Sequence, residues 1–368
     1  MMKACTILSV YLLFAIFCLA QNGSGLKDYL TNNSHPVNLD DFAQESAFFR
    51  SVMRGKILFV FGEGGSHSLD LNNQMRVYLL REFSGMNLKY FFIESGRTNA
   101  FGHNQYLQSQ DEAADSLYKA DTAFRNQMRQ IRKIYNSGAH FEYKGVDMEW
   151  SGSFYRAVKR ITTEVSPNGI DSIKLLHEIL IDTSYLHYDD ADRFKNQAQF
   201  LKLYIGLGRL FLRDSSALRA CLSPEHYKEL RYFLSNPQTA PPEGNRNPGM
   251  AQNLLAEIAP VDTTATYLLD IGSAHSLLSR KRAVIGILNN TAVLSNKMMI
   301  MNVYCDHCSI NGTILDESLI GFMKGDVLEA FRDCAKGDLT IFNLANVPAA
   351  LSYLREYGDL VLFAKNQQ

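Results

Sequence analysis

The sequence lacks the signatures of several common classes of protein. Lys and Arg total 37 and Asp and Glu total 38 among 368 residues, so the chain has none of the positive excess that nucleic-acid binding requires. After the first twenty residues, no segment is long and apolar enough to span a bilayer. There is no internal repeat and no low-complexity segment. We therefore expect a globular protein that acts on a small molecule, with no nucleic-acid partner and no membrane span.

Several catalytic motifs are also missing. No Gly-x-Ser-x-Gly segment is present, so an ordinary serine-hydrolase triad finds no support. The chain has no phosphate-binding loop of the P-loop kind and no His-Glu-x-x-His zinc motif. Gly62 to Gly65 do not have the spacing of a dinucleotide-binding fingerprint. Any catalytic site must therefore use another arrangement of residues.

The first twenty residues have the pattern of an export signal. Lys3 provides a positive start, and Ile7 to Phe17 form a short apolar core. Small residues before Gln21 predict cleavage after Ala20, which would deliver the protein to the periplasm or the medium. Anchoring as a lipoprotein at Cys18 is the less favoured alternative, because Phe17 is bulky for a lipid-attachment site.

Few cysteines remain after such a cleavage, and their number is even: Cys221, Cys305, Cys308 and Cys334. An even number in an exported protein favours at least one disulfide, and three pairings are possible. The segment Cys305-Asp306-His307-Cys308 also has the form of half a zinc site, but no second half completes it.

Seven apolar segments predict the strands of an α/β domain. Most are continuous apolar runs, which is typical of strands covered by helices on both faces. Helical patterns lie between them, at Gln74–Phe83 and Gln105–Tyr135. This alternation predicts a mostly parallel central sheet flanked by helices. The expected strands are Lys56–Glu63, Leu88–Glu94, Phe141–Asp147, Thr266–Ile271, Met298–Tyr304, Leu339–Leu344 and Leu360–Ala364.

The middle of the chain differs, because Phe154–Leu234 contains no convincing strand. Tyr185–Leu212 and Pro224–Leu234 are predicted to be helices, and Pro237–Gly249 a loop. We interpret the block as an all-helical cap insertion that forms one wall of the site; the alternative is helical packing without a functional role. The expected divisions are a signal peptide at 1–20, a loosely ordered lead-in at 21–40, the first part of the α/β core at 41–150, the cap at 151–245 and the second part of the core at 246–368.

Charged side chains follow two of the predicted strands. Glu63 and His67 come after the first, and Glu94 and Arg97 after the second. Parallel strands place ligand-binding and catalytic groups at their carboxyl ends. A carboxylate beside His67 would fix its tautomer and raise its basicity, as a general base requires. The alternative is that Glu63 caps nearby amides and that His67 is exposed.

Further candidates follow the same logic. Arg97 either pairs with Glu94 or binds negative charge on a substrate or oxyanion. Asp147 ends a third strand, and Trp150, the only tryptophan, forms either a pocket wall or part of the core. His275 follows a fourth strand, and Arg246 lies shortly before it as a second cation.

This ordered set of segments resembles the erythromycin esterase family and its wider superfamily, which includes haem-binding lipoproteins and metal-dependent proteases. The spacing from Glu63 to His67 is one residue longer than in the family, and the Arg246 element matches loosely. The matching segments are Gly62-Glu63 with His67, Phe92-Ile93-Glu94, Gly145-Val146-Asp147, Arg246 to Met250, and Gly272 to His275.

The resemblance implies an exported α/β hydrolase with a helical cap that cleaves an ester with water activated by histidine. His67 would be the general base, Glu63 or Glu94 would orient it, and His275 would act as acid or second base. Arg97, Asp147, Trp150 and Arg246 would bind the substrate. No cofactor is required for this chemistry. The alternatives are an unknown divalent metal held by the same side chains, or a haem or small-ligand binding protein without turnover.

Overall fold

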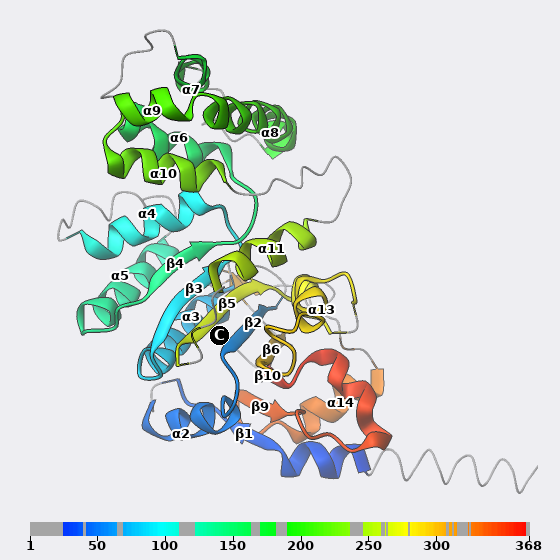
Figure 1. Ribbon diagram of the computed structural model, residues 1–368. Coiled ribbons are helices and arrows are strands. Elements are labelled where there is room, and N and C mark those ends of the chain that lie inside the picture. Colours follow the sequence, from blue (N-terminus) through cyan, green and yellow to red (C-terminus); the bar gives the residue numbers. More distant parts are fainter. Residues whose placement is uncertain are drawn as a thin grey trace, which may run out of the picture.

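A central eight-stranded sheet organises the chain (Figure 1). The computed structural model describes residues 25–39, 42–64, 69–109, 122–162, 170–181, 190–235, 246–258, 262, 264–278, 280–306, 309–310, 313–314, 323 and 325–365. The strand order is β1-β9-β10-β6-β2-β5-β3-β4. Neighbours from β10 to β4 are parallel, whereas β9 runs antiparallel to both β10 and β1. The bounds are β1 Ser34–Pro36, β2 Leu58–Glu63, β3 Leu88–Ile93, β4 Glu142–Gly145, β5 Thr266–Gly272, β6 Met298–Cys305, β9 Leu339–Asn343 and β10 Leu360–Ala364.

The predicted α/β fold with a mostly parallel sheet is confirmed, and all seven predicted strands form. Every residue of β2, β6 and β10 is buried, as continuous apolar runs require. One strand of this sheet was not predicted, namely β1, which lies in the segment expected to be a loosely ordered lead-in. There, residues 25–32 are helical, and Ser34 pairs with Phe342 at the edge of the sheet. The fully buried Leu30 fastens this segment to the core.

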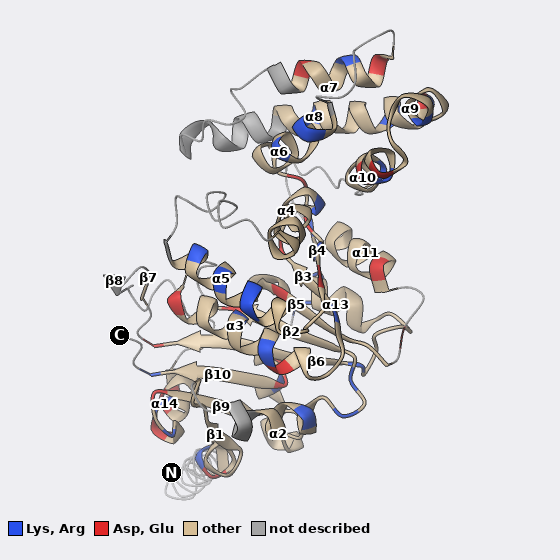
Figure 2. Cartoon of the chain, turned by 90° about the vertical axis from the view of Figure 1, so that its left-hand side faces the viewer, with Lys and Arg blue, Asp and Glu red and all other residues tan. Residues whose placement is uncertain are grey.

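Helices cover both faces of the sheet. Because side chains alternate along a strand, Phe59 and Phe61 face one layer and Leu58 and Val60 the other. The first layer contains α2 Phe42–Val52, α3 Asp70–Ser84, α4 Arg97–Gln108 and α5 Thr122–Asn136; the second contains α11 Asn247–Ile258, α13 Val284–Asn289, α14 Gly325–Cys334 and the 3-10 segment Ala349–Tyr357. Figure 2 shows these layers from the side. A short hairpin pairs β7 Ser309–Ile310 with β8 Thr313–Ile314.

Two helix predictions need correction. The single helix expected over Gln105–Tyr135 is two helices, α4 and α5, and α4 begins eight residues earlier, at Arg97. The carboxylate of Glu149 accepts the first amides of α4 and so fixes its start. The predicted loop Pro237–Gly249 ends inside α11, because proline is compatible with the first turn of a helix. Residues 236–245 lie outside the described part of the chain.

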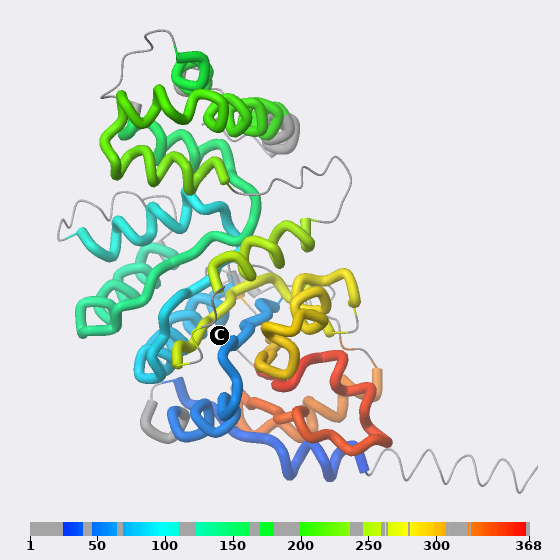
Figure 3. Tube along the Cα trace, in the orientation of Figure 1, coloured from blue at the N-terminus to red at the C-terminus, as the bar shows by residue number. Residues whose placement is uncertain are grey.

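The helical block is present and has a core of its own. Its helices are α6 Ser151–Thr162, α7 Asp171–Ile181, α8 Asp190–Arg213, α9 Ser215–Cys221 and α10 Pro224–Leu234. Phe154, Phe200, Tyr204 and Phe233 pack inside it. The chain leaves the sheet after β4 and returns before β5, so the block stands beyond one end of the sheet (Figure 3). No strand occurs in the described parts of 151–235, as predicted.

The cysteine predictions can be narrowed. Cys221 and Cys334 carry free thiols, and Cys308 lies outside the described residues. The predicted disulfide therefore stays a prediction and is now restricted to Cys305 and Cys308. Within the described ranges, no helix is long and apolar enough to cross a membrane. The predicted signal peptide also falls outside them.

Glycine is required where β2 reaches the edge of the sheet. A Cβ at Gly62 would overlap Asn302 Oδ1 and Ser276 Oγ. We therefore expect Gly62→Ala to lower the free energy of unfolding by about 1–3 kcal/mol, since overpacking displaces buried neighbours. Chemical denaturation measures this change.

Gly102 in α4 provides the matched control. A Cβ there meets nothing within 4 Å, so Gly102→Ala should raise the stability by about 0.5–1 kcal/mol. Equal effects of the two substitutions would show that β2 does not depend on this close approach.

Candidate active site at the carboxyl edge of the sheet

The carboxyl ends of four neighbouring strands meet at one edge of the sheet. Glu63 of β2 pairs in register with Gly272 of β5, and Ile93 of β3 pairs with both Asp270 and Gly145. Parallel neighbours therefore bring side chains that are far apart in sequence to a common edge. Two groups of ion pairs form there, and each has an arginine at its centre.

The first arginine group joins β3, the end of β4 and the start of α11. Arg246 donates through Nη2 to Glu94 Oε1 and through Nη1 to Asp147 Oδ2. Glu94 Oε2 accepts from the backbone N–H of Gly272 at 2.7 Å, which ties β3 to β5. Burial raises the pKa of Asp147, and the positive charge of Arg246 opposes this shift. Arg246 is thus already engaged with two carboxyl groups.

His275 completes this group from the short helix α12 Ser273–Ser276. Its Nε2 lies 3.3 Å from Glu94 Oε1 and 3.4 Å from Arg246 Nη2. Its Nδ1 lies 2.6 Å from Asn247 Oδ1. The Asn247 amide N–H₂ donates to Arg282 O at 2.7 Å, which identifies Oδ1 as the acceptor that faces His275. His275 therefore carries its proton on Nδ1 when neutral, and Nε2 faces Glu94.

The second arginine group is more deeply buried. Arg76 of α3 donates through Nε to Asp270 Oδ2 at 2.6 Å and through Nη2 to Glu63 Oε1. Burial raises the pKa of Asp270 well above its usual value; Arg76 opposes the shift and the charge of Glu63 adds to it. One arginine is thus shared by two carboxyl groups, and burial together with the charge of Glu63 favours the protonated form of Asp270. The described partner of Glu63 is Arg76, whereas His67 lies outside the described residues.

Arg97 belongs to a different place from the one expected. It neither pairs with Glu94 nor lines the cavity described below. Its guanidinium donates to Tyr232 O at 3.0 Å and Ser235 Oγ at 2.7 Å, and it lies 3.9 Å from Glu257. Arg97 therefore fastens the end of α10 to the core. Trp150, directly before α6, is half-buried and does not line the cavity.

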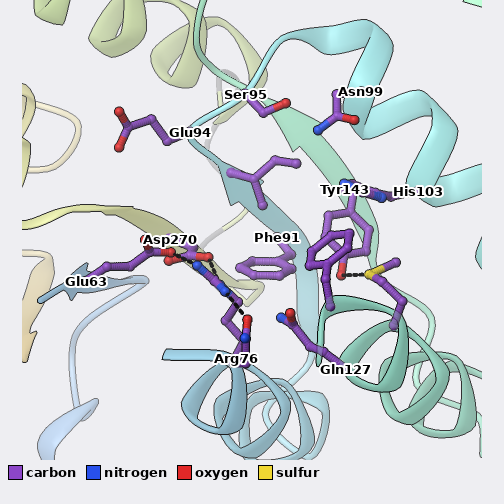
Figure 4. Close-up of a pocket in the computed structure, with 14 residues that line it drawn as sticks. Glu63, Arg76, Phe91, Glu94, Ser95, Asn99, His103, Gln127, Tyr143 and Asp270 are labelled. Atoms are coloured by element: carbon purple, nitrogen blue, oxygen red, sulfur yellow. Dashed lines mark hydrogen bonds and ion pairs between the residues drawn. The ribbon is translucent and has the colours of Figure 1, made fainter. Parts of the chain in front are cut away.

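A cavity of about 290 Å³ opens beside the two groups (Figure 4). Glu63, Glu94, Arg76 and Asp270 form its polar rim. Its remaining described lining comes from α3, β3, β4, α4 and α5, and includes Asn73, Phe91, Phe124, Met128, Tyr143, His103 and Gln127. None of these residues belongs to α6–α10, so the helical block does not form the expected wall in the described part of the chain. The helical block instead lines a smaller cavity behind α4, and this smaller cavity shares Asn99 and His103 with the cavity at the sheet edge.

Several residues of the site were missed by sequence reasoning. Arg76 and Asp270 each interrupt an apolar pattern, and a charge within such a pattern predicts a buried partner. Asn247 and Gln127 carry no comparable signal, because amides are common on exposed helices. In the described part of the chain, no group of three or more His, Cys, Asp or Glu side chains is placed to hold a metal ion.

His103 should make the stability of the protein depend on pH. Burial lowers its pKa from 6.5 to about 4, and the charge of Arg156 adds to the shift. Between these values the unfolded chain binds a proton that the folded chain does not. Stability should therefore fall as the pH drops from 6.5 to 4, by up to about 3 kcal/mol, because one pKa unit corresponds to about 1.36 kcal/mol.

Urea denaturation at pH 7 and pH 4.5 tests this expectation. His103→Asn should reduce the loss of stability between the two pH values. His140→Asn, at an exposed position, should leave it unchanged. Asp270 acts in the opposite direction, because a raised pKa favours the folded state in acid, so only the difference between variants isolates His103. An unchanged loss in His103→Asn would contradict the assignment.

Comparison with known proteins places the fold. No protein-family model matches the chain, and no curated protein matches it in sequence. Similar solved structures include a succinoglycan biosynthesis protein (TM-score 0.63, 8% identity, covering 93% of this chain and 96% of that one). A Bacillus cereus protein aligns with a TM-score of 0.62 (10% identity, 93% and 97% covered).

A mutant of the erythromycin esterase EreC in its open conformation aligns with a TM-score of 0.59 (14% identity, 88% and 93% covered). The haem complex of ChaN from Campylobacter jejuni reaches a TM-score of 0.33, which is too low to carry an argument. Identities of this size establish the fold alone. The chain therefore has the α/β fold of the erythromycin esterase-like proteins, and its activity must be argued from its own residues.

Proposed function

We propose that the protein is a hydrolase that cleaves an ester bond with water at the carboxyl edge of the sheet. The observation that carries the proposal is the setting of His275. Asn247 holds its ring through Nδ1, Glu94 faces Nε2 at 3.3 Å, and the side chain keeps 18% of its surface exposed. A histidine oriented from one nitrogen, with a carboxylate near the other, is suited to proton transfer.

Each group then has a role in the reaction. His67 takes a proton from water, and the water oxygen forms a bond to the ester carbonyl carbon. The bond between that carbon and the alcohol oxygen breaks, and the leaving alcohol takes the Nε2 proton of His275, which enters this step as the imidazolium and keeps its Nδ1 proton on Asn247. Glu94 stabilises the protonated imidazole and keeps the ring in place. Protons balance, because the one removed from water replaces the one given to the alcohol.

The charges of the site favour an uncharged ester as substrate. Both arginines of the edge are bound to two carboxyl groups each. Glu63, Glu94 and Asp270 also line the cavity, whose only described cation is Arg76. An anionic substrate would meet carboxylates without an uncommitted positive charge to pair with it. The earlier expectation that Arg97 and Arg246 bind an anion is not part of this proposal.

Histidine variants test the mechanism on uncharged aryl esters such as p-nitrophenyl acetate and butyrate. His275→Asn and His67→Asn should each lower kcat by about 10²–10⁴, the usual contribution of general acid–base catalysis. His140→Asn, outside the site, should retain wild-type turnover. Thermal unfolding checks that all variants are folded.

Two outcomes would contradict the proposal. Wild-type turnover in His275→Asn would leave His275 a structural residue only. Absence of ester turnover by the wild-type protein, together with a Soret band on addition of haem, would favour the binding-protein alternative.

Export remains part of the proposal. We expect the exported protein to begin at Gln21 and to contain a disulfide between Cys305 and Cys308, because the compartment would be oxidising. The intact mass and the number of free thiols of denatured, unreduced protein measure both. A mass that includes residues 1–20, a lipid on Cys18, or four free thiols would refute the corresponding statement.

A further inference from the structure

The cavity at the sheet edge continues into a groove along the outside of the first helical layer. The cavity shares Asn73 and Gln127 with a hollow of about 450 Å³ between α3 and α5. That hollow in turn shares Arg81 and Gln130 with another of about 610 Å³ farther along the same two helices. The shared lining residues make the three spaces neighbours along these helices, and we call them together the α3–α5 groove. From Asn73 to Ser84 it follows α3 for about 16 Å, at 1.5 Å per residue.

Uncharged amides are the most frequent polar side chains in the first stretch of this groove, which Leu39, Val77, Tyr78 and Ala123 also line. Asn73 and Gln74 contribute from α3, and Asn126, Gln127 and Gln130 from α5. Ser84 and Ser137 add hydroxyl groups farther along. Among the described residues that line the first stretch, only Asp70 and Arg81 are charged, and their signs are opposite. Figure 2 shows α3 and α5 running beside each other on this side of the molecule.

Gln127 gives an independent sign that the groove has a ligand. It lines both the cavity and the groove, and only 4% of its surface is exposed. Its Oε1 is buried and accepts no hydrogen bond among the described residues. A buried acceptor without a donor costs about 1–3 kcal/mol. In Figure 4 its side chain reaches from α5 into the cavity. A ligand that donates a hydrogen bond there would remove this cost.

We infer that the α3–α5 groove binds an oligosaccharide chain, so that the substrate is an ester carried on a glycan. The inference rests on the proposed function for the bond that is cleaved. Sugar hydroxyls both donate and accept hydrogen bonds, and each amide offers one acceptor and two donors in return. The sugar next to the ester donates to Gln127 Oε1, and the following sugars lie along Asn126 and Gln130. The apolar floor at Phe91 and Phe124 receives the ring faces or the acyl group near the reacting bond.

Other long ligands fit the groove less well. An acyl chain would leave the amides facing methylene groups, which costs their hydrogen bonds to water. A peptide in extended form is recognised through free backbone groups of a strand edge, whereas both walls here are helices with internal backbone bonds. A nucleic acid needs a row of cations, and the described lining offers Arg81 and Lys133 only.

Glycan binding is tested first with the full-length mature protein on a glycan microarray, and then by calorimetry with the best oligosaccharide. Gln127→Leu, which is of similar size, should raise the Kd of this oligosaccharide at least tenfold, because the buried acceptor is lost. The double variant Asn126→Ala with Gln130→Ala should weaken it several-fold; both positions are exposed, so folding is not at risk. Gln252→Ala, an exposed amide on α11 across the sheet, is the matched control and should bind as the wild type does.

Turnover of p-nitrophenyl acetate separates this inference from the proposed function. The double variant should hydrolyse this small ester at the wild-type rate, because the ester reaches the site without the groove. No binding to any glycan, or binding that the groove variants do not change, would overturn the inference while ester turnover stands. If the groove variants weaken glycan binding but the wild-type protein hydrolyses no ester, the α3–α5 groove stands as a glycan-binding site and the proposed hydrolase activity is refuted.

Discussion

Two arginines, each shared between two buried carboxyl groups, hold together the edge of the sheet where the candidate site lies. Arg76 joins Glu63 to Asp270, and Arg246 joins Glu94 to Asp147. None of these four acids could remain at the end of a buried strand without a partner, since removing one member of a buried ion pair costs about 3–5 kcal/mol. Each arginine comes from outside the sheet, Arg76 from α3 and Arg246 from the start of α11. The ion pairs therefore fix both helical layers to the strand ends and, with them, the position of Glu94 beside His275.

The same interaction limits the chemistry. Two arginines pair with four carboxyl groups, so the described part of the edge has no excess of positive charge, and burial raises the pKa of both Asp147 and Asp270. His275 belongs to this edge and keeps 18% of its side-chain surface exposed. Its ring depends on Asn247, the residue directly after Arg246. The arrangement that neutralises the strand ends thus also orients the proposed catalytic acid.

The sequence predicted the sheet well, because fully buried parallel strands require continuous apolar runs and little else in the chain has them. Because parallel strands end at one edge, it also placed Glu94, Asp147 and His275 near one another, and their proposed roles stay predictions. It failed where side-chain partners decide the structure. Arg97 follows Glu94 closely in sequence, yet the start of α4 turns it toward Tyr232 and Ser235. The charge of Arg76 within an apolar pattern predicts a buried partner, but no pattern in a single sequence identifies that partner. Nor does any pattern reveal that an ordinary amide such as Gln127 will be buried.

The strand order explains why a large helical block can be inserted without disturbing the edge. β5 lies between β2 and β3, although the cap separates it from both in sequence. All four acids belong to the sheet or follow it directly, and the cap has its own apolar core. Arg97 holds the end of α10 against the core, and Arg246 is the first described residue where the chain returns. The cap is therefore attached through residues beside the site, while in the described part of the chain no residue of α6–α10 lines the cavity or the α3–α5 groove.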